Sequence, residues 1–289
     1  EKSLDADISN PTVLCCHSNI VTRLSYATNI GRPSIGQLIP TTTINLPGVN
    51  DSVGSISTSN PSLKPQIANN FDLSGEYYFE PAGVVSVGLF LKEIKDFIYT
   101  RAGDTVGSGP NNGFEGQYEG YLLTSQQNGG FAKIEGVELN YSQQFTFLPR
   151  WLSGFGAFAN YTRMKVVGNY GAGNAISLAP TSEVAGFNPE TANAGISYIK
   201  DRLSVRAAWN HNGRYLTSFS LTQSALQYSR ARDVVDIKTT YQISKNFGAY
   251  LDAVNIFGEA DRASESYDGA PRNIHKMAPM FFFGLNARL

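Results

Sequence analysis

The chain has 289 residues, with 23 basic and 24 acidic side chains and a formal net charge of −1. This balance provides no positive field for nucleic acid and argues against a DNA- or RNA-binding role. Charged residues make up 16%, below the roughly 25% of an ordinary soluble domain. Aromatic residues reach 12% and there are 28 glycines, a mixture that favours strands and turns over helices.

The first predicted strands cover 12–16 and 20–30, with a corner at 17–19 between them. Cys15 and Cys16 are adjacent and would point to opposite faces of a strand, so a disulfide between them would be strained. We interpret them as unpaired thiols. A long loop, rich in Pro, Gly, Thr and Ser, follows at 32–65.

The hairpin that follows shows the clearest alternation in the chain. Strands at 70–79 and 84–99 flank a tight corner at 80–83, and each has one apolar and one polar face. The apolar face carries Phe71, Leu73, Tyr77, Phe79, Val85, Val87, Leu89 and Leu91.

The same pattern recurs in three further hairpins and in a terminal strand at 279–289. The hairpins are 132–147 with 154–164, 191–198 with 203–215, and 233–243 with 247–257. Their corners are short, whereas long loops at 101–130, 166–190 and 258–278 lie at the other ends. Aromatic residues lie beside the corners: Tyr77, Tyr78, Phe79, Phe145, Phe147, Trp151, Phe155, Tyr198, Tyr241 and Phe247.

About ten full strands and a partial one are therefore predicted. Several exceed the ~9–11 residues that cross a bilayer as a tilted strand. Short turns at one end, long loops at the other and aromatic residues at the interface indicate an all-β, antiparallel, up-and-down transmembrane β-barrel. No window reaches the ~20 apolar residues of a membrane helix. The first residues lack the apolar core of a signal peptide, so we expect that one was removed or that the chain is a piece of a longer protein.

The polar faces carry charged residues with no spacing that selects an acid/base pair, and a hydrated barrel interior explains them. They are Asp72, Glu76, Lys92, Glu138, Arg206, Asp236 and Lys238. His17, His211 and His275 lack metal-ligand spacing, and no nucleophile elbow is present. We predict that the chain is not an enzyme and has no metal site or cofactor.

The predicted loops carry aromatic residues among amides and glycines. Two interpretations are equally supported: capture of an external ligand by stacking, or packing of the loops on one another. The residues concerned are Phe114, Tyr118, Tyr121, Tyr170, Phe187, Phe219, Tyr228 and Tyr267.

The terminal strand has an apolar outward set, and Gly284, Asn286 and Arg288 belong to its inward set. Such a strand would be an exposed edge in a soluble protein, whereas a barrel pairs it. The outward set is Phe281, Phe283, Leu285, Ala287 and Leu289.

Several stretches resemble those of a known family. They are RLSYATNIGRP at 23–33, NPSLKP at 60–65, NFDLSGEYYF at 70–79, GLFLKEIKDFI at 88–98, GVEL at 136–139, LP at 148–149, NYT at 160–162 and NIF at 255–257. Together they resemble the distal barrel of TonB-dependent outer-membrane receptors from about residue 20 onward, whereas 1–19 match poorly. The ending Phe281, Phe283, Gly284, Leu285, Ala287, Leu289 resembles the family's barrel-assembly signal, although Leu289 stands where an aromatic residue is usual.

The resemblance implies a 22-stranded barrel around a plug domain, of which residues 1–289 are the C-terminal portion with ten or eleven strands and no plug. It implies a place among the lipid and lipopolysaccharide of the Gram-negative outer membrane, and insertion by the barrel-assembly machinery. It also implies energy-coupled uptake of an iron chelate, cobalamin or an oligosaccharide, with the TonB complex as partner through the missing N-terminal part. An open half-barrel leaves two unpaired edges in lipid, so we expect a fragment or a truncated reading frame whose parent performs the transport.

Two alternatives stay open. About ten strands could close by themselves as a small porin or adhesin. A soluble all-β carbohydrate-binding module also has alternating strands. Pairing between the strand at 20–30 and the terminal strand would favour the small barrel over the fragment.

Overall fold

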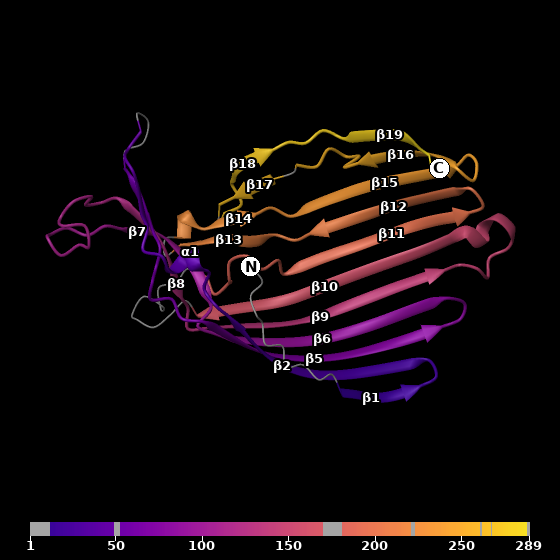
Figure 1. Ribbon diagram of the computed structural model, residues 1–289, viewed down its shortest axis with the longest axis horizontal. Helices are drawn as coiled ribbons and strands as arrows, with labels where there is room; N and C mark the ends of the chain where they lie inside the picture. The colour runs from indigo at the N-terminus through magenta and orange to yellow at the C-terminus, as the bar shows by residue number, and fades with distance from the viewer. Residues whose placement is uncertain are drawn as a thin grey trace.

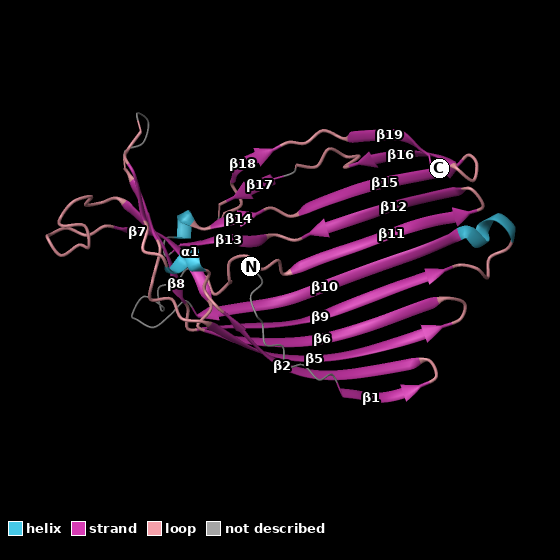
Figure 2. Cartoon of the chain, viewed as in Figure 1, coloured by secondary structure: helices cyan, strands magenta, loops and turns pink. Residues whose placement is uncertain are grey.

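A computed structural model describes residues 12–48, 53–169, 181–220, 223–260, 262–266 and 268–287. Strands dominate these residues, beside the short helix α1 (Ile35–Leu38) and the 3-10 turns η1 (Arg150–Gly154) and η3 (Gln223–Ala225) (Figure 2). Within the described ranges, no helix is both long enough and apolar enough to span a membrane. The predicted all-β class is confirmed.

The larger sheet has 11 strands, and each pairs antiparallel with the next main-sheet strand along the chain (Figure 1). Short turns join the strands at one end and long loops join them at the other, as predicted. In spatial order the strands are β1 (Thr12–His17), β2 (Ile20–Gly31), β5 (Gln66–Phe79), β6 (Gly83–Lys95), β9 (Phe131–Gln144), β10 (Phe155–Asn169), β11 (Glu190–Lys200), β12 (Leu203–Asn212), β15 (Arg232–Gln242), β16 (Phe247–Val254) and β19 (Met280–Ala287).

The main sheet is open. Strands β1 and β19 lie at its two edges, and among the described strands they do not pair with each other. The closure that would have favoured a self-contained small barrel is therefore not present in this part of the chain. The open sheet agrees with a partial barrel.

The register gives the sheet one apolar and one polar face. Leu24 lies opposite Leu73 and Leu73 opposite Leu89, so these residues share what we call the outer face. Arg23 and Glu138 are aligned with each other across the sheet and are shifted by one position along the strands from those residues. They therefore share the opposite face, which we call the inner face. Because successive side chains in a strand point to opposite faces, this register separates apolar from polar side chains across the whole sheet.

The outer face exposes an apolar band of the kind that lipid covers. On β19, Phe281 is 67% exposed, Phe283 84% and Leu285 79%. At the turn end of the sheet, the ring of Phe155 lies 4.8 Å from that of Tyr198. Arg163, on the same face of β10, is eight residues away, or roughly 27 Å of strand. A tilt of ~40° reduces this to about 20 Å, near the ~25 Å band of outer-membrane barrels.

The smaller sheet has 8 strands and is built from the long loops, which the sequence analysis did not predict as strands (Figure 1). In order they are β18 (Pro271–His275), β17 (Arg262–Glu265), β14 (Gln227–Ser229), β13 (Tyr215–Ser220), β7 (Ile98–Thr105), β8 (Leu122–Asn128), β4 (Ser55–Thr58) and β3 (Thr42–Asn45).

Two strands predicted as continuous are each divided between the two sheets. The strand predicted at 84–99 ends at Lys95 as β6, and β7 then starts at Ile98. The break falls at Asp96, whose φ of +54° interrupts the extended backbone. The strand predicted at 203–215 likewise ends at Asn212 as β12, before β13.

We call the 11-stranded sheet the main sheet and the 8-stranded sheet the loop sheet. The buried core lies where the two meet. Its side chains come from strands of the smaller sheet and the segments just before them, from the loop before β11 and from the loop end of β9. They are Phe97, Tyr99, Ala132, Val184, Leu216, Phe219, Leu226 and Tyr228. The loops are therefore folded onto the loop end of the barrel wall as an ordered cap.

Candidate ligand-binding face

A cleft of about 510 Å³ lies on the inner face beneath the cap. Strands β2, β5, β6, β9 and β10 supply its floor, and Phe187, from the loop before β11, contributes its ring. We call it the inner-face cleft. Its lining side chains are Ser25, Ala27, Asn29, Asn70, Asp72, Phe90, Lys92, Ile134, Glu138, Met164 and Phe187, with Leu91 beside them.

The cleft combines charged, amide and apolar groups. Asp72, Lys92 and Glu138 supply charges of both signs. Asn70 is 8% exposed, and its amide Nδ2 donates to the Ala27 carbonyl oxygen at 3.2 Å. Its Oδ1 has no hydrogen-bond partner among the described residues, although a buried polar atom normally has one. Such a site suits a ligand that offers hydrogen-bond donors beside a flat apolar surface.

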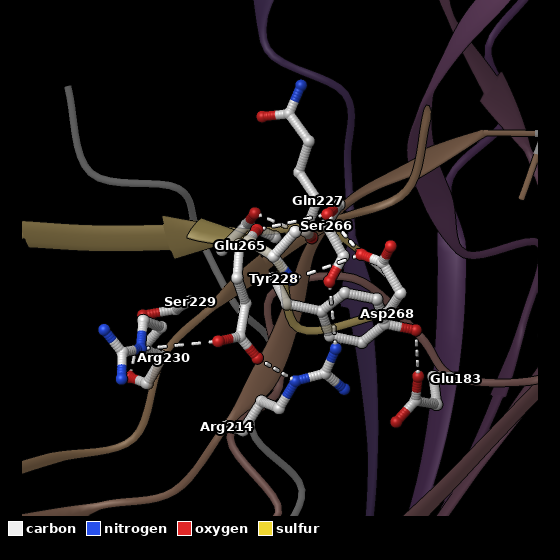
Figure 3. Close-up of polar contacts among 11 residues, drawn as sticks. Glu183, Arg214, Gln227, Tyr228, Ser229, Arg230, Glu265, Ser266 and Asp268 are labelled. Atoms are coloured by element: carbon white, nitrogen blue, oxygen red, sulfur yellow. Dashed lines mark hydrogen bonds and ion pairs between the residues drawn. The ribbon is translucent and has the colours of Figure 1, made fainter. Parts of the chain in front are cut away.

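The cap above the cleft is held together by a polar network around Tyr228 (Figure 3). Its hydroxyl donates to Glu183 at 2.7 Å, and the Arg214 guanidinium lies 3.6 Å from the centre of its ring. Burial and the Glu183 carboxylate raise the pKa of Tyr228 to about 12. This side chain therefore joins the loop before β11 to the loop between β12 and β15.

Glu265, on β17, extends the same network to the last long loop. Arg214 donates to its carboxylate, and Arg230 Nε lies 3.4 Å from its other oxygen (Figure 3). The residue is only 8% exposed, so its charge needs these partners to remain buried. Three loops far apart in sequence are thus tied into one unit.

The structure places the predicted loop aromatics in three different environments. Phe219 and Tyr228 are each 1% exposed in the buried core, where they pack inside the cap, and their contact with a ligand stays a prediction. Phe187 is half-buried and lines the inner-face cleft. Tyr170 and Tyr267 lie outside the described residues.

The remaining loop aromatics contact one another edge to face in the loop between β7 and β8. The Phe114 and Tyr118 rings are 6.1 Å apart, and those of Tyr118 and Tyr121 are 5.3 Å apart. Tyr121 also packs so closely on Gly54 that a Cβ there would clash with its ring. Packing of the loops on one another therefore accounts for these three rings, and contact with a ligand stays a prediction.

Several predicted polar-face residues have partners along the inner face. Arg206 stacks 4.3 Å from the centre of the Phe158 ring, and Asp236 accepts a hydrogen bond from the Asn255 backbone at 2.8 Å. Glu76 pairs with Arg23 near the turn end. Within the described ranges, no three His, Cys, Asp or Glu side chains are grouped as metal ligands.

No pattern in the sequence distinguishes Asn70, Arg214 or Glu265 as site residues. Asn70 sits in a polar-face position like many others, and its burial is a property of the folded structure that the strand pattern does not encode. Arg214 and Glu265 are 51 residues apart, so no local pattern links them.

The terminal strand β19 has the predicted arrangement in its described part. Phe281, Phe283, Leu285 and Ala287 share the outer face with their β16 partners. Gly284 lies on the inner face against the Tyr250 ring, too close for a Cβ. Arg288 and Leu289 lie outside the described residues, and the role of this strand in barrel assembly stays a prediction.

An open antiparallel sheet with an apolar outer face, a polar inner face and long capping loops defines the class: a portion of a transmembrane-type β-barrel. A family model described as "TonB dependent receptor-like, beta-barrel" matches residues 17–256. The chain therefore belongs to the TonB-dependent receptor β-barrel family, which is a family of receptors rather than enzymes.

Solved structures of this type share the fold. One is a variant of the ferric enterobactin receptor PfeA from Pseudomonas aeruginosa in complex with enterobactin, at 19% identity and a TM-score of 0.65, covering 98% of this chain and 40% of that one. The siderophore receptor PirA from Acinetobacter baumannii has 17% identity and a TM-score of 0.63, covering 96% and 40%. The copper transporter OprC has 15% identity and a TM-score of 0.60, covering 93% and 38%.

These identities show the fold alone. The chain spans about 40% of the length of the receptors that it matches. No curated protein sequence matches it significantly.

Proposed function

We propose that residues 1–289 are the C-terminal portion of a single outer-membrane barrel domain, and that the whole protein imports a scarce ligand with energy supplied through the TonB complex. The observation that carries this proposal is the polar inner-face cleft under an ordered cap, on a sheet whose other face is apolar. This arrangement provides a hydrated wall for a ligand path and a lipid-facing exterior.

The ligand class that we favour is a ferric siderophore. One similar structure is described as a ferric enterobactin receptor in complex with enterobactin, and another as a siderophore receptor. The inner-face cleft offers Phe90 and Phe187 for stacking, Lys92 for an anionic chelate, and Asp72 and Glu138 as acceptors. Cobalamin and oligosaccharides are the alternative ligands. Copper is a further candidate, because the similar OprC is described as a copper transporter.

The test is uptake by a Gram-negative host that lacks its own receptors and expresses the full-length protein. We expect uptake of labelled iron from a catecholate chelate, and loss of that uptake when the TonB gene is deleted. Labelled cobalamin, a maltooligosaccharide and copper are the comparison ligands. Uptake that persists without TonB would overturn the proposal, and so would a failure to import any of the four.

A variant pair connects the uptake to the cleft. Phe187→Ala removes the ring at the cleft and should lower the affinity for the chelate. Phe147→Ala is the matched control, because this side chain is 61% exposed at the turn end of the sheet. Equal uptake by the two variants would show that the cleft is not part of the ligand path.

A further inference from the structure

A second hollow, of about 340 Å³, lies next to the inner-face cleft, between the cap and the loop end of the main sheet. We call it the cap cavity. Its floor is made of Gln66, Ile94 and Ala132 on β5, β6 and β9, and its walls come from the start of β7, from β13 and from segment 184–187. Phe187 lines both hollows and therefore stands at their boundary.

The register places the two hollows one step apart along the inner face. On β9, Ile134 lines the inner-face cleft and Ala132 lines the cap cavity. On β6, Lys92 and Ile94 stand in the same relation. Two residues along a strand span roughly 7 Å, so a ligand that occupies one hollow can reach the other.

The backbone holds Phe187 at this boundary. Segment 182–189 runs beside the end of β10 that β11 does not reach, and it is hydrogen-bonded to β10 near both of its ends, at 2.7 and 2.8 Å. Gly186, at a φ of +89°, donates its N–H to the Leu216 carbonyl oxygen at 2.8 Å. The backbone position of Phe187 is therefore fixed between the two hollows.

The two hollows differ in chemistry. The inner-face cleft contains Asp72, Lys92 and Glu138, whereas no charged side chain is among the described residues that line the cap cavity. The walls of the cap cavity include the rings of Phe97 and Phe219, with threonine and serine hydroxyls beside them. Because burial of an unpaired charge is costly, the cap cavity suits a neutral, flat group.

The size of the cap cavity fits one aromatic group. An apolar cavity of ~150 Å³ holds a benzene molecule. A volume of about 340 Å³ therefore leaves room for a ring and the linker that attaches it to a larger ligand. The aromatic walls would add offset-stacked or edge-to-face contacts with that ring.

We propose that the inner-face cleft and the cap cavity form one two-part ligand site. The cleft takes the anionic metal centre of a chelate, and the cap cavity takes a neutral aromatic appendage of the same molecule. The ligand class is thereby narrowed to metal chelates that carry such an appendage. This inference rests on the proposed function, because it takes a metal chelate as the ligand.

The test is equilibrium binding of two ferric chelates to the full-length protein in detergent. Both chelates are lysine with a catechol group on each amine, and they end in a methylamide or in a benzylamide. The benzyl ring should enter the cap cavity, so wild type should bind the benzylamide about tenfold more tightly than the methylamide. Equal affinities of wild type for the two chelates would overturn the inference, since the cavity would then hold water or another part of the protein.

A variant pair connects this preference to the cap cavity. Thr100 is exposed and lines the cavity, so Thr100→Trp places a large ring at its rim. This variant should lose the preference for the benzylamide and keep the wild-type affinity for the methylamide. Thr105→Trp is the matched control, because Thr105 is exposed on the same strand but is not among the lining residues. Thr217→Trp, at the rim on β13, is a second filling variant with the same expected result.

The outcomes for the variants are equally decisive. Survival of the benzylamide preference in both filling variants would overturn the inference. Loss of the preference in the Thr105→Trp control as well would overturn it too, because the effect would then not belong to the cavity.

Uptake of the same two chelates separates this failure from a failure of the proposed function. Cells that import both chelates equally well through TonB leave the proposed transport intact and remove only the two-part site. Cells that import neither chelate remove the two-part site, and their uptake of cobalamin, the maltooligosaccharide or copper then decides whether the proposed transport stands.

Discussion

At the residue scale, the cap depends on a few buried polar contacts between loops. Tyr228 and Glu265 are almost fully buried, and each bonds across a loop boundary. Breaking such a contact leaves a buried charge or a buried polar atom without a partner, which costs more than the contact itself contributes. Single substitutions in the cap should therefore lower the stability of the cap and leave the stability of the sheet unchanged.

Tyr228 gives a prediction for alkaline pH. In the folded cap the pKa of the Tyr228 phenol is about 12, whereas the pKa of an unfolded tyrosine is near 10. The cap should keep its full stability below about pH 10 and lose stability between about pH 10 and pH 12, where only the unfolded state releases the proton. The tyrosinate absorbance of wild type minus that of Tyr228→Phe should rise near pH 12. The same difference measured in denaturant is the control and should rise near pH 10. A native difference that also rises near pH 10 would contradict the burial of this phenol.

Glu265 gives a prediction for the stability of the cap. Glu265→Gln removes the charge that pairs with Arg214 and Arg230, and should destabilise the cap by about 1–3 kcal/mol. Limited proteolysis of the loops at neutral pH measures this as faster cleavage with an unchanged sheet. Asp268→Asn is the control, since Asp268 is exposed and its hydrogen bonds within the described residues are to Ser266 and Ala270 of its own turn. Equal cleavage of the two variants would show that the network does not tie the loops together.

At the element scale, strand glycines differ according to what surrounds them. A Cβ at Gly195 on β11 would lie 2.6 Å from the Ala207 carbonyl oxygen and would clash with the Phe158 ring. That ring cannot easily move, because Arg206 stacks on it. A Cβ at Gly75 on β5 would meet nothing within 4 Å.

These two positions form a matched pair for strand packing. Gly195→Val should destabilise the sheet by about 1–3 kcal/mol or more through overpacking, whereas Gly75→Val should assemble normally. The folded fraction is measured as the heat-modifiable band of the full-length protein on a denaturing gel. Equal folded fractions of the two variants would mean that β10, β11 and β12 are packed less tightly than the structure shows.

The main-sheet strands could be predicted from sequence. Their side chains face lipid and water in turn, so apolar and polar residues alternate along each strand. The break at Asp96 interrupts that pattern by a local backbone turn, which the alternation does not encode. The loop sheet could not be predicted. Its strands are as short as the three residues of β14, and its parallel pairings join segments that are distant in sequence. Of the inner-face cleft, Phe187 was singled out by its residue type, whereas Asn70 acquires its role only through tertiary burial.

At the scale of the whole molecule, the faces and the edges of the sheet need different surroundings. Lipid suits the apolar outer face, and a hydrated interior suits the polar inner face. Among the described strands, β1 and β19 each pair on one side only, and lipid cannot hydrogen-bond the backbone groups on the other side. Each unpaired group in an apolar medium costs several kcal/mol, so we expect further strands to pair with these edges in the membrane.

This requirement predicts how residues 1–289 behave when they are expressed without the rest of the protein. In detergent they should give mixed oligomers joined through β1 and β19, with no heat-modifiable monomer, because only another strand can supply the missing hydrogen bonds. The full-length protein should give a heat-modifiable monomer. Size-exclusion chromatography and the denaturing gel measure both properties. A heat-modifiable monomer of residues 1–289 would mean that β1 pairs with β19 by curling the sheet into a smaller barrel, and a self-contained porin or adhesin would then replace the receptor portion proposed above.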